Sequence, residues 1–134
     1  MKQLFTGIYN KFTTGAPAIY TNLGGRLRLH EAKQGETFPY CVYFLIGTSP
    51  DFYFGEQKLF STIVQFSLFT EERSASNIGT YYDNLIALYD ESILTVADYS
   101  FLRMERTWDY LIRDAPEGVW QWSLQYRITM EKFT

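Results

Sequence analysis

The sequence predicts a single α+β domain over residues 1–134, with an antiparallel or mixed sheet of four to five strands, two main helices on one face and a long C-terminal β-hairpin. Three observations lead to this fold class. Apolar residues recur at helical spacing near the start of the chain and again in its middle, and they alternate at strand spacing near its end. The 134 residues are 46% hydrophobic and 20% charged, which suits one buried core and leaves too little length for two domains.

The N-terminal quarter predicts two helical segments and a short strand. Apolar residues at offsets of three and four over residues 2–14 predict an amphipathic helix, which Gly15 and Pro17 end. Residues 18–23 predict a helical turn that ends at a Gly-Gly pair. Residues 26–30 alternate leucine with polar side chains, which predicts a short strand with one solvated face.

The middle of the chain predicts two strands and the second main helix. A polar loop over residues 31–37 leads to a strand over 40–46, and the Gly-Thr-Ser-Pro-Asp run at 47–51 predicts a turn. A second strand over residues 59–70 presents three alternate apolar side chains to one face. The helix over residues 75–90 carries an apolar stripe of Ile78, Tyr82, Leu85, Ile86 and Tyr89.

The C-terminal third predicts a long β-hairpin. Residues 99–113 and 119–130 are its strands, and the Asp-Ala-Pro-Glu-Gly run at 114–118 is its loop. From Trp120 to Met130 every second side chain is apolar and its neighbours are polar, which is typical of an antiparallel strand with one face on the core.

The charge argues against general nucleic-acid binding. The formal net charge is −3, whereas affinity for phosphates requires a basic face. Residues 1–40 carry five Lys or Arg against two acidic residues, and residues 41–98 carry two against eight. This split is explained either by ordinary solvated faces or by a basic patch on one subunit that meets an acidic patch on the next.

The composition offers no catalytic or metal site. The single histidine, His30, and the single cysteine, Cys41, cannot form a usual zinc site, and one cysteine allows no internal disulfide. Asp and Glu gather at 71–72, 90–91 and 114–117, where helix ends and turns explain them without catalysis. We therefore expect no enzyme activity and no cofactor, and no run of apolar residues is long enough for a membrane span.

The aromatic content of 19% favours a subunit interface, because Tyr and Trp are enriched where protein surfaces meet. The run Phe52-Tyr53-Phe54 stands in a predicted connection. It either folds back over the core or docks on a neighbouring subunit or partner. We take Phe52, Tyr53 and Phe54 as candidate interface residues, together with Arg26 and Arg28 on the solvated face of the short strand.

The chain resembles the tail completion proteins of long-tailed phages and prophages, which include tail terminators and head–tail joining proteins. The resemblance rests on an N-terminal amphipathic helix, a Gly-Gly-Arg motif, a polar loop, a Pro-Tyr strand start and a terminal hairpin. Its residues here are Leu23-Gly24-Gly25-Arg26 and Phe38-Pro39-Tyr40-Cys41-Val42-Tyr43. Leu27 and Arg28 stand where the family often has a β-branched residue and an aromatic one.

The resemblance implies a structural virion protein without a cofactor, assembled in the host cytoplasm and located in the tail or neck. It implies a homohexameric ring that terminates or completes the tail tube, contacts the tail tube protein and joins it to the head connector and neck proteins. DNA would pass through without specific recognition, so we expect a lining with few lysines.

Two other functions remain open at this point. One is a small ligand-binding or enzymatic α+β domain with an aromatic pocket, in which tyrosines and one buried carboxylate would surround a small apolar ligand. The other is an accessory binding module similar to a toxin or antitoxin. Association that depends on concentration favours the ring, and a deep pocket in a stable monomer favours the ligand-binding domain.

Overall fold

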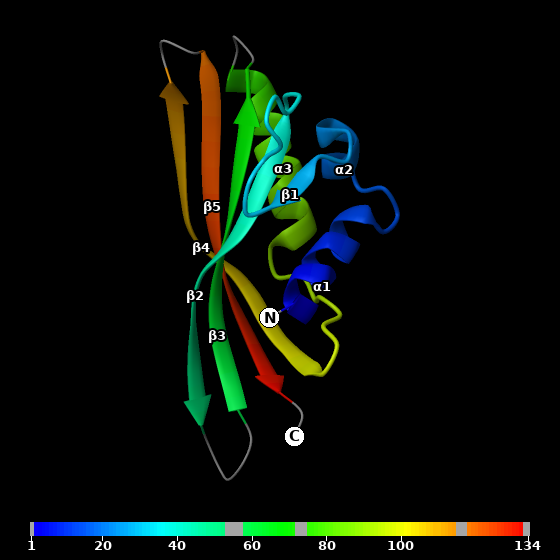
Figure 1. The fold of residues 1–134 in the computed structure, drawn as a ribbon, viewed down its shortest axis with the longest axis vertical. Helices are drawn as coiled ribbons and strands as arrows, with labels where there is room; N and C mark the ends of the chain where they lie inside the picture. Colours follow the sequence, from blue (N-terminus) through cyan, green and yellow to red (C-terminus); the bar gives the residue numbers. More distant parts are fainter. Residues whose placement is uncertain (1, 53–57, 72–74, 115–117, 133–134) are drawn as a thin grey trace.

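The computed structural model describes residues 2–52, 58–71, 75–114 and 118–132. Its elements in chain order are α1 (Lys2–Thr13), α2 (Ala18–Leu23), β1 (Leu27–Leu29), β2 (Tyr40–Phe52), β3 (Lys58–Thr70), α3 (Ala75–Tyr89), β4 (Tyr99–Asp114) and β5 (Val119–Lys132). The strands form a five-stranded mixed sheet in the order β1-β2-β3-β5-β4, in which β1 is parallel to β2 and all other pairs are antiparallel. The helices lie on one face of this long, twisted sheet and leave the other face free of helices (Figure 1). The predicted α+β class and the terminal hairpin are confirmed.

The two N-terminal helices follow from apolar spacing and glycine. Leu4, Ile8 and Phe12 of α1 are fully buried, at the offset of four that places them on one helix face. Gly24 ends α2 in the left-handed conformation, at φ 58°, where its N–H bonds to the Thr21 carbonyl. The chain can therefore turn at once into β1.

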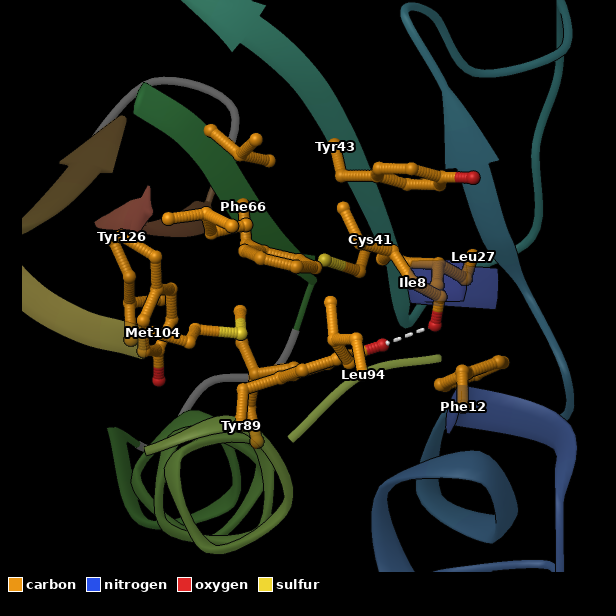
Figure 2. Close-up of a cluster of buried hydrophobic side chains, with 14 of the residues drawn as sticks. Ile8, Phe12, Leu27, Cys41, Tyr43, Phe66, Tyr89, Leu94, Met104 and Tyr126 are labelled. Atoms are coloured by element: carbon orange, nitrogen blue, oxygen red, sulfur yellow. Dashed lines mark hydrogen bonds between the residues drawn. The ribbon is translucent and has the colours of Figure 1, made fainter. Parts of the chain in front are cut away.

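The core lies between the helices and one face of β2, β3, β5 and β4. Its centre is aromatic: the ring of Phe66 lies 4.8 Å from that of Tyr89 and 5.7 Å from that of Tyr126. Figure 2 shows these rings side by side and the hydrogen bond from the Tyr89 hydroxyl to the Ile8 carbonyl, at 2.9 Å. This bond joins α3 to α1 inside the core.

The predicted turn at residues 47–51 is wrong, because β2 continues to Phe52 and pairs with β3 along its whole length. A β-bulge between Leu45 and Gly47 leaves Ile46 without a partner in this pairing. After Tyr43, β2 pairs with β3 on one side, and no described strand pairs with it on the other. A proline is tolerated at such an edge because its missing N–H need not join the ladder.

The remaining boundaries agree closely with the predictions. The first strand is β1, three residues long, and the main helix of the middle region ends at Tyr89. Leu27 is 3% exposed but Leu29 is 38% exposed, so the two leucines of the short strand do not share a buried environment as their alternation suggests. No helix in the described ranges is long and apolar enough to cross a membrane.

Candidate functional site

The helix-free face of the sheet presents three consecutive rows of side chains with one common pattern. The core residues of β3 and β5 face the helices, so the residues between them face the other way. Strand register sets the rows as Phe44, Gln65, Gln125 and Trp108; then Val42, Ser67, Ser123 and Tyr110; then Tyr40, Phe69, Gln121 and Ile112. Across β2, β3, β5 and β4 each row is uncharged and has an apolar or aromatic side chain at both ends. On β1, Arg28 extends the second row beside Val42.

The centre of this face is a network of amides and hydroxyls on β3 and β5. The Gln125 amide nitrogen donates to the Gln65 amide oxygen at 3.0 Å, and the hydroxyls of Ser67 and Ser123 lie 3.1 Å apart. The amides of Gln65 and Gln121 donate to these two hydroxyls, which helps to leave Ser67 3% and Ser123 4% exposed. The hydrogen-bonding groups therefore satisfy one another, and Arg28, the cation that extends the second row on β1, is bonded to Glu36.

On β5 and β4, charged residues follow beyond the row of Trp108. Arg127 lies opposite Glu105, and Arg103 and Glu131 follow in the next rows. Both signs occur together, and the Arg103 guanidinium is 3.1 Å from the Glu105 carboxylate. Among the residues that the structure describes, this face therefore presents no basic surface of one sign, which nonspecific DNA binding requires.

One margin of the face is β4, an edge strand of the sheet. Four of its side chains are exposed over five residues: Trp108 at 45%, Tyr110 at 56%, Leu111 at 36% and Ile112 at 43%. The rings of Trp108 and Tyr110 stack at 6.1 Å with an interplanar angle of 17°. An edge strand with this much exposed apolar surface is well suited to pairing with another chain.

The opposite margin holds a groove of about 290 Å³ between the β1–β2 loop and the sheet. Its walls include His30, Glu31, Ala32, Tyr40, Val42, Phe44 and Phe69. Its sheet wall also includes the polar residues Gln65, Ser67 and Gln121. The apolar and aromatic side chains of this wall can receive an aromatic side chain.

The two candidate arginines hold this loop in place. The Arg26 guanidinium donates to the Pro39 carbonyl at 3.0 Å, and Arg28 makes two bonds to the Glu36 carboxylate at 3.1 and 3.2 Å. These bonds from Arg28 lower the pKa of Glu36, and the Glu36 side chain is only 5% exposed. Arg26 and Arg28 therefore bond within the chain, next to the groove, and an intersubunit role for them remains a prediction.

The aromatic run predicted to form an interface lies largely outside the described residues. Phe52 is the last residue of β2, and Tyr53 and Phe54 follow it beyond the described range. Their interface role also stays a prediction.

A polar cluster on the helix side joins α3 to β4 and β5, and sequence reasoning missed it. The Arg106 guanidinium lies 3.3 Å from the Asp90 carboxylate and 2.8 Å from that of Asp109. Tyr126 donates to Asp90 at 2.5 Å, and Tyr82 donates to Asp109 at 2.9 Å. Burial, and then the bond to Asp90, raises the pKa of Tyr126.

Asp90 therefore fastens the end of α3 to the sheet, whereas its sequence position suggested only a cap or a solvated turn. The ring of Tyr82 also stacks on Trp122 at 3.9 Å, which adds an apolar contact to the same junction. No spacing along the chain reveals the cluster, because its members come from α3, β4 and β5.

The residues with reactive side chains lie apart from one another. Cys41 is fully buried, and burial raises the pKa of its thiol, which disfavours the thiolate that a nucleophile requires. His30 is exposed, has φ 70°, and its ring centroid lies 5.8 Å from that of Phe5 in a T-shaped arrangement. Among the described residues, no three His, Cys, Asp or Glu side chains are placed to hold a metal ion.

Comparison with known proteins gives a match in structure only. No protein-family model matches the chain, and no curated protein matches it. Among solved structures, a chain in the virion of a native gene transfer agent (GTA) particle superposes with a TM-score of 0.77, over 96% of this chain and 94% of that one, at 11% sequence identity. This chain therefore has the fold of a protein found in a gene transfer agent virion.

Proposed function

We propose that this chain is a structural virion protein that forms a ring at the phage head–tail junction, where it terminates or completes the tail tube and joins it to the head connector. The observation that carries the proposal is the fold shared with a gene transfer agent virion chain over almost the full length of both. The resemblance of Leu23–Arg26 and Phe38–Tyr43 to tail completion proteins supports the more specific role.

The helix-free face supports a passage for DNA. From β2 to β4 its three rows are uncharged, and their amides and hydroxyls bond to one another. Arg28, which extends one row on β1, is neutralised by its ion pair with Glu36. DNA in contact with such a lining would gain little affinity, so it could move past. We propose that this face lines the ring, in keeping with the expected lining of few lysines.

The proposal treats the whole chain, residues 1–134, as one non-enzymatic unit that acts through contacts. Its partners would be other copies of itself, the tail tube protein and the neck proteins. Virion assembly would take place in the host cytoplasm.

The test is deletion of the gene in a phage or prophage that encodes the chain, followed by electron microscopy of the particles. Loss of a tail terminator leaves tubes longer than normal, and loss of a joining protein leaves tubes of normal length detached from filled heads. Complementation from a plasmid is the control and restores joined particles. Joined particles of normal length in the deletion strain would refute the proposal.

A further inference from the structure

The stretch of β4 from Trp108 to Ile112 has few of the features that keep edge strands from pairing with other chains. Natural edges are protected by lysine, proline, short length, inward-pointing charges or β-bulges. The two bulges of β4 lie before Trp108. β4 has 16 residues, and its stretch from Trp108 to Ile112 contains neither lysine nor proline. The charge within this stretch, Asp109, is bonded to Arg106 and Tyr82 on the helix side of the strand. Trp and Tyr, which supply most of this surface, are the residues that dominate binding energy in protein interfaces.

The groove at the opposite margin lies at the same level of the sheet as this stretch. Tyr110 is in the row of Val42, and Trp108 is in the row of Phe44, and both Val42 and Phe44 line the groove. A second copy beside the first, in the same orientation, would therefore bring its Trp108 and Tyr110 to the β1 margin at the level of the groove without a shift along the strands. Arg28 of β1 lies in the row of Val42 at this margin.

Strand direction also suits this arrangement. β1 and β2 run in one direction, and β4 runs in the opposite direction, since three antiparallel pairings separate β2 from β4. The β4 strand of one copy next to the β1 strand of another is thus antiparallel, which is the stronger kind of strand pairing.

We propose that the Trp108–Ile112 stretch of β4 docks on the β1 margin of a second copy of this chain, with Trp108 and Tyr110 seated in the groove beside the loop that Arg26 and Arg28 hold. The contact is head-to-tail, because the two surfaces are different, so it repeats from copy to copy and forms a closed ring if the rotation closes. The inference deepens the proposed ring function by naming its repeated contact.

The experiment measures the mass of the purified full-length chain by light scattering and sedimentation over a concentration series from micromolar to millimolar. The wild type is expected to form multiples of the 15.7 kDa monomer. A donor variant, Trp108→Glu with Tyr110→Glu, and a receiver variant, Ala32→Arg at the groove, are each expected to weaken association at least tenfold. The matched control is Leu102→Glu, a 50% exposed position at the other end of the same strand, which is expected to associate as the wild type does.

Mixing the two variants gives the decisive result. Each variant keeps one intact surface, so an equimolar mixture is expected to form a heterodimer and nothing larger. If two copies pair through β4 alone about a two-fold axis, the receiver variant dimerises by itself, and the inference is overturned. If the double glutamate variant does not fold, as judged by circular dichroism, Tyr110→Ser serves as the donor variant.

A wild-type chain that stays monomeric at millimolar concentration also overturns this inference. It leaves the virion role untouched, because the deletion experiment tests that role by the form of the particles. Abnormal particles together with a monomeric chain would support the virion role and refute the proposed contact.

Discussion

Removal of the Tyr89 hydroxyl is the most direct test of how the helices are held together on the sheet. Tyr89 ends α3, is fully buried, and donates to the Ile8 carbonyl of α1 at 2.9 Å, across 81 positions of sequence. The substitution Tyr89→Phe removes this bond and keeps the ring, which packs on Phe66 at 4.8 Å and on Tyr126 at 6.3 Å.

The expected magnitude follows from what is lost. The net contribution of one buried neutral hydrogen bond is about 0.5–1.5 kcal/mol. The Ile8 carbonyl lies within α1 and can still accept the helical bond from residue 12, so it is not left without a partner. We therefore expect Tyr89→Phe to lower the free energy of unfolding by about 1 kcal/mol, and the melting temperature by roughly 2–5 °C.

The assay is urea unfolding followed by circular dichroism, with Tyr89→Ala as the comparison. Removal of the whole ring is expected to cost about 3–5 kcal/mol, because it leaves a cavity between α3 and the sheet. The two losses separate the hydroxyl from the ring. A Tyr89→Phe variant as stable as the wild type, or as unstable as Tyr89→Ala, would refute the reasoning.

Two further predictions concern a close backbone contact and an ion pair. A methyl group on Gly7 of α1 would lie 2.7 Å from the Thr95 carbonyl oxygen, so Gly7→Ala is expected to destabilise the fold by about 1–3 kcal/mol. The control is Gly79→Ala in α3, where the added methyl group has no atom within 4 Å and is expected to stabilise the fold by roughly 0.5–1 kcal/mol. Thermal unfolding measures both variants, and equal effects at the two glycines would contradict the close contact at Gly7. Arg28 lowers the pKa of Glu36 from its ordinary value of 4.5. The ion pair therefore stabilises the folded state fully above pH 4.5, and this stabilisation is lost as the pH falls through the lower pKa that Glu36 has in the folded state. Melting temperatures of wild type and Glu36→Gln should therefore differ at neutral pH and converge in acid, and a difference that persists in acid argues against the ion pair.

Local pattern predicted much of the fold. The alternation from Trp120 to Met130 placed β5 correctly, and its residues Leu124, Tyr126, Ile128 and Met130 are fully buried. Helical spacing likewise identified α1 and α3. These features depend on side-chain period, which neighbours in sequence define.

The turn predicted at residues 47–51 failed for a reason that local pattern does not contain. Gly47 and Pro50 are turn formers, yet β3 supplies a partner for every residue from Gly47 to Phe52. Pairing with a distant strand outweighed the local preference, and the pairing continues beyond the bulge after Leu45.

The sequence by itself determined the helices α1 and α3 and the core faces of β3 and β5, because these depend on residue type and on spacing within one segment. Only the tertiary structure decided which residues share a surface. Strand order made β4 an edge, and register aligned Trp108 and Tyr110 with the groove at the far margin. The tertiary structure also brings Arg26 and Arg28 into hydrogen bonds with the loop beside that groove. Such neighbours come from distant segments, and their meeting depends on the pairing of whole strands, which the period of one segment does not encode.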